Sequence, residues 1–142
     1  GDSCHKKVAV GMNTLVLDTG ALIALDRNDR SIWKALRSAV IADDNIRVPS
    51  GAIAQAWRDG ARQVLLARAL SHCDEIALAG SFARAAGLLC GRASTSDVID
   101  ASVALTMAGA AHSENVAVLT SDPDDIRHLL SVLNVEARVV EI

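Results

Sequence analysis

Short apolar runs alternate along the chain with longer segments in which apolar residues recur at helical spacing. The apolar runs Thr14–Leu17 and Val116–Thr120 are too short for helices and are predicted to be strands. Strands are also predicted at Ile46–Val48, Val139–Ile142 and, more weakly, Glu75–Leu78, each of which contains one charged residue. Continuous apolar runs of this length are typical of parallel strands that are buried on both faces. The pattern therefore predicts a single α/β domain with a mostly parallel sheet flanked by helices.

Helices are expected between these strands, because apolar residues there recur three or four positions apart. Asp122-Pro123 marks the start of the last one, since proline is favoured in the first helical turn. On the helix that begins at Ser50, Ile53 and Trp57 are expected to face the core. The predicted helices span residues 21–25, 31–41, 50–58, 62–70, 81–89, 97–107 and 123–133.

Length and composition fit one domain. The chain has 142 residues, 51% of them hydrophobic and 25 of them alanine, which suits helices packed closely over a sheet. No apolar run approaches the roughly 20 residues that cross a bilayer, so we expect a soluble protein. Three scattered cysteines, Cys4, Cys73 and Cys90, indicate a reducing cytoplasm. We interpret residues 1–12 as a leader or added segment before a domain that spans 13–142.

The charge balance limits how the protein can meet nucleic acid. The net charge is −3, so a phosphate-bearing substrate must be met by a local arginine patch or by metal ions. Arg58, Arg62 and Arg92 are the candidate phosphate contacts. With three aromatic residues in the chain, a platform for stacking single-stranded bases is not expected.

Four aspartates carry the candidate chemistry. Asp18 and Asp122 each follow a predicted strand, and sites in open α/β sheets form at the carboxyl ends of the strands. Asp97 and Asp100 are three residues apart, which places both on one helical face near its start. We therefore expect the carboxylates of Asp18, Asp100 and Asp122 to converge in one pocket.

Taken singly, Asp18, Asp97 and Asp122 have an alternative interpretation as helix-capping residues. As a group, four converging carboxylates would repel one another by several kcal/mol at an effective dielectric near 20. A divalent cation relieves that repulsion, and ligand sets made only of oxygen favour Mg²⁺ or Mn²⁺. Such an ion supports hydrolysis of a phosphodiester.

Three motifs resemble the PIN-domain family, and within it the VapC-type toxins, over about Asn13 to Ile142. The resemblance implies a PIN-like fold and a metal-dependent endoribonuclease, often dimeric, that a VapB-like antitoxin holds inactive. The motifs are Leu15–Leu25, Thr95–Ala101 and Val118–Asp125.

The same resemblance implies roles for individual acids. Asp18, Asp100 and Asp122 match the family's metal-binding aspartates, and Asp97 is an additional acid on the same helix as Asp100. Asp125 matches a position that supplies the last carboxylate in some members. The expected catalytic and metal-binding set is therefore Asp18, Asp97, Asp100 and Asp122, with Mg²⁺ or Mn²⁺ as the cofactor and RNA as the substrate.

One position departs from the family pattern. The family usually places a glutamate on the helix after the second strand, where this chain has Gln55. A glutamine can coordinate a cation through its carbonyl oxygen but carries no charge. Gln55 therefore keeps open a second function, a PIN-like module that binds RNA or a partner without cutting.

An aspartyl-phosphate mechanism is less consistent with the sequence. Receiver domains and phosphatases of the haloacid-dehalogenase type place a lysine late in the chain to balance the phosphate. The lysines here, Lys6, Lys7 and Lys34, are all early, and the position two residues after Asp18 holds Gly20. A Rossmann dinucleotide site also fails, since no glycine-rich loop follows the first strand.

Overall fold

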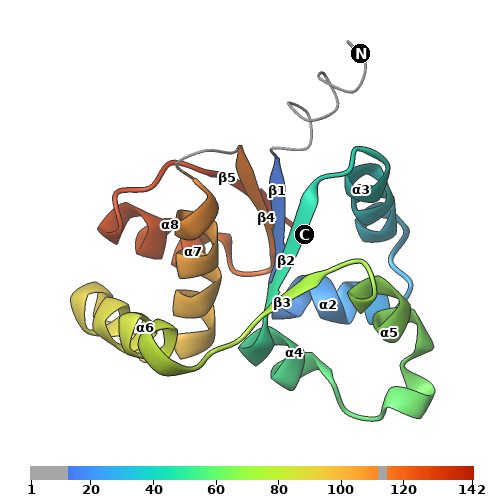
Figure 1. Ribbon diagram of the computed structural model, residues 1–142, viewed down its shortest axis with the longest axis horizontal. Helices are drawn as coiled ribbons and strands as arrows, with labels where there is room; N and C mark the ends of the chain where they lie inside the picture. Colours follow the sequence, from blue (N-terminus) through green and yellow to red (C-terminus); the bar gives the residue numbers. More distant parts are fainter. Residues whose placement is uncertain (1–12, 112–114) are drawn as a thin grey trace.

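Five parallel strands form one sheet at the centre of the computed structural model, which describes residues 13–111 and 115–142 (Figure 1). The expected leader, residues 1–12, lies outside the described residues. The strand order is β3-β2-β1-β4-β5, and every neighbouring pair is parallel. The strands are β1 (Thr14–Leu17), β2 (Asn45–Pro49), β3 (Asp74–Ile76), β4 (Val116–Thr120) and β5 (Arg138–Glu141).

Helices cover both faces of the sheet, as Figure 1 shows. Helices α2 to α5 pack on one face and α6 to α8 on the other. In the described part of the chain they are α2 (Thr19–Asp26), α3 (Arg30–Ile41), α4 (Ser50–Ala56), the 3-10 turn η1 (Gly60–Arg62), α5 (Val64–Leu70), α6 (Gly80–Ala93), α7 (Val98–Ala110) and α8 (Pro123–Val132).

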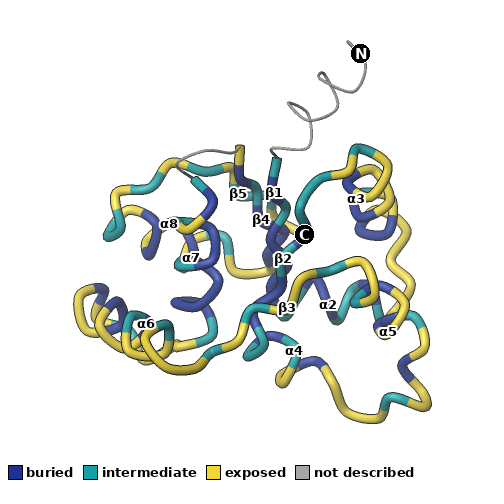
Figure 2. Tube along the Cα trace, viewed as in Figure 1, coloured by how far each residue is buried: buried dark blue, intermediate teal, exposed yellow. Residues whose placement is uncertain are grey.

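The alternation of side chains along β1 explains why its run is continuously apolar. Val16 packs into the cluster under α6, α7 and α8, whereas Leu17 packs into the cluster under α2 to α5. Successive residues of a strand point to opposite faces, so a strand covered on both sides needs apolar residues throughout. The most buried part of the chain runs through β1, β2 and β4 and the inner faces of the helices (Figure 2). The predicted α/β fold is confirmed.

Several expected boundaries differ from the structure. Helix α4 ends at Ala56, and Trp57 leaves it in an extended conformation with ψ of 127°, so its side chain is 39% exposed and not packed in the core. Helix α5 begins at Val64, which is 58% exposed. Helix α6 continues to Ala93 and stops at Ser94, which adopts a left-handed conformation.

Within residues 13–111 and 115–142, no helix has both the length and the apolar character required to cross a membrane.

Candidate active site

The topology brings two aspartates to the point where the strand order reverses. The chain runs from β1 outward to β2 and β3, then returns to form β4 and β5 on the other side of β1. Asp18 follows β1 and Asp122 follows β4, and these strands pair in parallel with Leu17 opposite Leu119. Their carboxyl ends therefore form the crevice in which open α/β sheets place their sites.

Asp18 is held in a fixed orientation between β1 and β4. It is 2% exposed, and it is the N-cap of α2. Its Oδ1 accepts a hydrogen bond from the Ala21 amide at 2.9 Å, and its Oδ2 accepts one from the Ser121 amide at 3.3 Å. Burial raises the pKa of Asp18, while hydrogen bonds from the Thr120 side chain and these two amides oppose the rise. The capping role expected for Asp18 is therefore real.

Asp97 and Asp100 meet at the start of α7. Asp97 is the N-cap, and its Oδ1 accepts a hydrogen bond from the Asp100 amide at 2.9 Å. Asp100 is 6% exposed, and its Oδ2 is buried with no hydrogen-bond partner. Burial raises the pKa of Asp100 to about 7, followed by the negative charges of Asp97 and Asp122, a side-chain hydrogen bond with Asp97 that favours the protonated form, and the charge of Asp125. Capping explains Asp97, but it leaves the buried carboxylate of Asp100 unexplained.

Asp122 connects the two parts of the site. It is the N-cap of α8, yet its side chain makes no capping hydrogen bond. Its charge raises the pKa of both Asp18 and Asp100, so it lies within electrostatic reach of each. The charge of Asp125, in the first turn of α8, also raises the pKa of Asp100, by less than the charge of Asp122 does. Asp122 thus links Asp18 electrostatically with Asp100, which also feels the charges of Asp97 and Asp125.

Gln55 lies next to this acidic cluster. The hydroxyl of Thr19, the residue directly after Asp18, donates a hydrogen bond to the Gln55 Oε1. This contact joins α4 to the first turn of α2. The hydrogen bond from Thr19 engages the Gln55 carbonyl oxygen, which is the atom expected to be able to coordinate a cation.

A glycine allows the turn after Asp18 to pack against the turn after β4. A Cβ built on Gly20 would collide with the Oγ of Ser121 and would lie 2.7 Å from the Ser121 Cβ. Gly20→Ala is therefore expected to lower the free energy of unfolding by about 1–3 kcal/mol, because the two turns must separate. Gly87→Ala is the matched control: a Cβ there meets nothing within 4 Å, and the change is expected to be neutral or stabilising. Urea denaturation of both variants checks this, and equal stabilities would contradict it.

The chemistry of the site fits a hard divalent cation. The ion pairs of the described residues are Arg62–Asp59 and Arg127–Asp124, so no arginine or lysine there pairs with Asp18, Asp100 or Asp122. A cation would supply the missing positive charge and a partner for the buried Asp100 Oδ2. In their present conformations, no three His, Cys, Asp or Glu side chains within 13–111 and 115–142 are placed to hold one ion. Binding would therefore require these carboxylates to turn toward it.

Each of the three arginine candidates makes a contact with its local surroundings. Arg58 donates to the carbonyls of Ala54 and Trp57 at the end of α4. Arg92 donates to the carbonyl of Val132, which joins α6 to the end of α8, and Arg62 pairs with Asp59 at 3.6 Å. Since each makes a local structural contact, their role as phosphate contacts stays a prediction.

Sequence reasoning missed three residues that shape the site. Thr19 positions Gln55, and Thr120 and Ser121 hold the carboxylate of Asp18. From the sequence, Thr120 is expected only to end an apolar strand. A polar pair placed between a buried strand and an aspartate is the signal that could have found Thr120 and Ser121.

No family model and no curated protein matches this chain. Among solved structures it is similar to a chain in the crystal structure of VapBC2 from Rickettsia felis bound to a DNA fragment from their promoter. The TM-score is 0.59 at 15% sequence identity, and the alignment covers 91% of this chain and 98% of that one. At this identity the likeness shows the fold alone: a single parallel sheet flanked by helices, the α/β architecture that the sequence predicts.

Proposed function

We propose that this protein is a metal-dependent endoribonuclease and the toxin of a toxin–antitoxin pair. One observation carries the proposal: the buried Oδ2 of Asp100 has no partner and lies among the charges of Asp97, Asp122 and Asp125. A group in this state costs stability, and strongly perturbed acids of this kind gather at functional sites. Capping a helix does not require such an arrangement.

The proposed metal ligands are Asp18, Asp100 and Asp122, with Asp97 as the fourth acid and Asp125 as its alternative. Hydrogen bonds from two backbone amides orient the Asp18 carboxylate in advance. By contrast, the Asp100 Oδ2 has no hydrogen-bond partner, and the Asp122 side chain makes no capping hydrogen bond. When bound, Mg²⁺ or Mn²⁺ would supply the charge that stabilises phosphoryl oxygens and makes water a better nucleophile.

The chain's own residues would orient the substrate and the attacking water. In hydrolysis the water oxygen bonds to phosphorus, the bond from phosphorus to the leaving ribose oxygen breaks, and that oxygen takes up a proton. The proton that the water releases would pass to whichever of the exposed acids Asp97 and Asp125 does not hold the metal. Because the chain lacks an aromatic platform, we expect RNA to be selected by shape and backbone.

The similarity to a VapBC2 chain supports the pairing with an antitoxin. We propose a VapB-like antitoxin as the partner, a cytoplasmic location, and a homodimer as a possible assembly. These proposals rest on the fold and on the motifs of the sequence.

The test of the proposed activity is cleavage of structured RNA by the purified, partner-free protein. We expect cutting with Mg²⁺ or Mn²⁺, loss of cutting with EDTA, and weaker binding of RNA as salt increases, because phosphate contacts release counterions. Absence of cutting with either metal would contradict the proposed activity.

A second function is favoured by Gln55, whose carbonyl oxygen is engaged by Thr19. If the site holds a cation poorly, the chain would be a PIN-like module that binds RNA or a partner without cutting. RNA binding that survives EDTA, with no cleavage, would identify this function.

Gln55→Glu is expected to tighten Mn²⁺ binding about tenfold, because it adds a negative charge next to the acidic cluster. The Thr19 hydroxyl can donate to a carboxylate as well, so the position of the side chain is retained. Gln55→Met, which is similar in size and uncharged, is the control and should not tighten binding. Calorimetric titration with Mn²⁺ measures all three proteins. Equal affinities for the wild type and Gln55→Glu would place this side chain out of reach of the ion.

A further inference from the structure

Helix α3, at the margin of the molecule in Figure 1, carries a row of basic side chains on its outer side. Arg30, Lys34 and Arg37 are four and three residues apart, so they share one face of the helix, and all three are exposed. The row is about 10 Å long at the helical rise of about 1.5 Å per residue. The side chains that α3 buries lie on its side toward the sheet: Ile32, Trp33, Leu36 and Ala39. We call Arg30, Lys34 and Arg37 the α3 basic row.

The charge of the α3 basic row is not neutralised by its surroundings. Helix α3 contains no acidic residue, and neither of the two ion pairs among the described residues involves it. Asp29 directly precedes the helix, but its carboxylate caps α3 and accepts hydrogen bonds from two backbone amides and the Ser31 hydroxyl. Arg37 lies 5.9 Å from the ring centre of Trp33. In a chain with a net charge of −3, the row is therefore a local positive patch.

A row of cations suits a chain of phosphates better than a single small anion. Each lysine or arginine that meets a phosphate of a nucleic acid releases condensed counterions, which favours binding. Arginine can also donate two parallel hydrogen bonds to one phosphate. With three aromatic residues in the chain, binding of RNA depends on its backbone more than on stacking of its bases. The α3 basic row thus has the chemistry that a phosphate-bearing substrate requires.

One cavity has residues of both the acidic cluster's surroundings and the start of α3 in its wall. Its volume is about 430 Å³. Arg27 and Asp29, in the loop before α3, line one part of it, and Arg27 is exposed without an ion-pair partner among residues 13–111 and 115–142. Gly20 and Ser121, which pack together beside Asp18, line another part. An RNA strand that leaves Asp18 through this cavity would pass Arg27 on its way to the α3 basic row.

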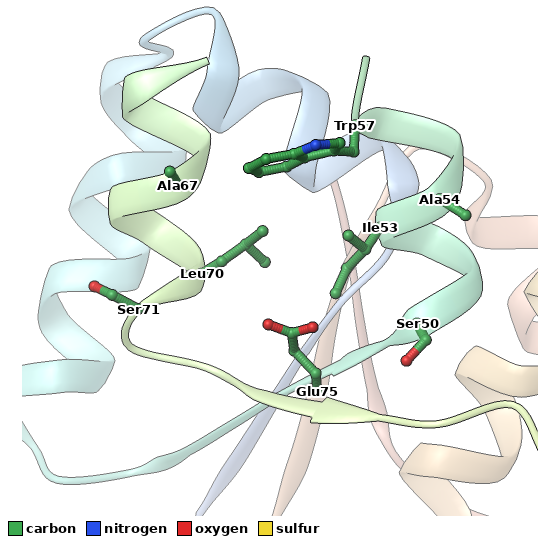
Figure 3. Close-up of a pocket in the computed structure, with 8 residues that line it drawn as sticks. All are labelled: Ser50, Ile53, Ala54, Trp57, Ala67, Leu70, Ser71 and Glu75. Atoms are coloured by element: carbon green, nitrogen blue, oxygen red, sulfur yellow. The ribbon is translucent and has the colours of Figure 1, made fainter. Parts of the chain in front are cut away.

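A different cavity, between α4 and α5, is less suited to RNA. Its volume is about 610 Å³. Figure 3 shows Ile53, Trp57 and Leu70 around it, with the Glu75 carboxylate directed into it. Glu75 is its one charged lining residue, and its negative charge would repel a phosphate. Electrostatics therefore favours the path along α3.

We infer that Arg27 and the α3 basic row bind the phosphate backbone of the RNA substrate outside the acidic cluster. The inference rests on the proposed function, in which RNA is the substrate. Phosphate contacts fix the position of a nucleic acid but carry no sequence information. The row would therefore hold RNA of any sequence, and the acids would act on the segment that lies beside Asp18.

The test measures binding of a fluorescently labelled RNA hairpin to the full-length protein in EDTA, where binding is separated from cutting. Fluorescence anisotropy gives the dissociation constant between about 50 and 200 mM salt. Arg30→Gln, Lys34→Gln and Arg37→Gln together are expected to weaken binding at least about tenfold. The slope of the logarithm of affinity against the logarithm of salt should become less steep by about 2–3, and by about 1 for Arg27→Gln alone.

The matched control combines Arg68→Gln, Arg84→Gln and Arg138→Gln. These three arginines are exposed and lie on α5, α6 and β5, so the control removes the same charge without forming or breaking a row. It should weaken binding less than about threefold and leave the salt slope nearly unchanged.

A double variant, Arg30→Gln with Lys34→Gln, keeps the contact of Arg37 with Trp33 and therefore separates loss of charge from any change in the fold. It should show about two thirds of the change in slope of the triple variant.

No binding of RNA in EDTA, an unchanged slope in the α3 variants, or an equal loss in the control would overturn the inference. So would poly-glutamate of matched charge that binds as tightly as the RNA, because α3 would then be a surface for an acidic protein. The proposed nuclease fails separately. If the wild type binds RNA through α3 but does not cut it with Mn²⁺, the inference holds and the nuclease does not. Cutting with Mn²⁺ by a chain whose α3 variants bind RNA normally would give the opposite result.

Discussion

Asp100→Asn is expected to reduce metal-dependent cleavage of RNA by about 100-fold or more. The change keeps the volume of the side chain but removes the charge of the carboxylate whose Oδ2 is buried without a partner. Loss of residues that merely support a metal site typically costs 10- to 100-fold, so loss of a charged ligand should cost at least as much. Single-turnover cleavage of a structured RNA with saturating Mn²⁺ gives the ratio of rates.

The matched control is Asp43→Asn, prepared in the same way. Asp43 is exposed and adopts a φ of 61°, a left-handed conformation that asparagine accepts readily. It precedes the amino end of β2, whereas Asp18 and Asp122 follow the carboxyl ends of strands that run parallel to β2. We expect Asp43→Asn to cut as well as the wild type. Equal cutting by all three proteins would assign the cleavage to a contaminating nuclease.

Asp100→Asn is also expected to stabilise the metal-free protein at pH 8. Burial and neighbouring acids raise the pKa of Asp100 to about 7, above its ordinary value near 3.8. Above pH 7 the folded protein carries an unfavourable charge that the unfolded chain tolerates, and this penalty is lost as the pH falls from about 7 toward 4. Because solvent screens part of the effect, we expect Asp100→Asn to gain about 1–2 kcal/mol at pH 8.

Thermal and urea denaturation in EDTA, at pH 8 and pH 5, measure this difference. The advantage of Asp100→Asn over the wild type should shrink at pH 5, whereas Asp43→Asn should differ from the wild type equally at both values. Adding Mn²⁺ at pH 8 should stabilise the wild type more than Asp100→Asn. If Asp100→Asn were less stable than the wild type at pH 8, the Asp100 carboxylate would be supporting the fold, which would contradict this prediction.

Much of the fold was predictable because its strands are buried on both faces. The runs at β1 and β4 are apolar at nearly every position, which distinguishes them from the amphipathic helices between them. Boundaries were harder where local contacts decide them. Trp57 leaves α4 because Gln63 holds the following loop, and α6 runs beyond Leu89 until Ser94 turns left-handed.

The acids of the candidate site were predictable from their positions at strand ends and at the start of a helix. Their detailed arrangement was not. Residues 18 and 121 are far apart in the sequence, so the hydrogen bond from the Ser121 amide to Asp18 depends on the pairing of β1 with β4. The contact of Thr19 with Gln55 likewise requires α2 and α4 to be packed together. Sequence spacing carries no information about contacts of this kind.

Anomalous X-ray diffraction from crystals soaked in Mn²⁺ tests the proposed metal site most directly. We expect a manganese peak between Asp18 and Asp100, with Asp122 also in contact, and the Asp100 Oδ2 among the ligands. Asp100→Asn crystals soaked identically should show a weaker peak or none. A wild-type crystal with no peak there, or with manganese bound only at exposed acids such as Asp124 and Glu141, would contradict the metal-dependent nuclease.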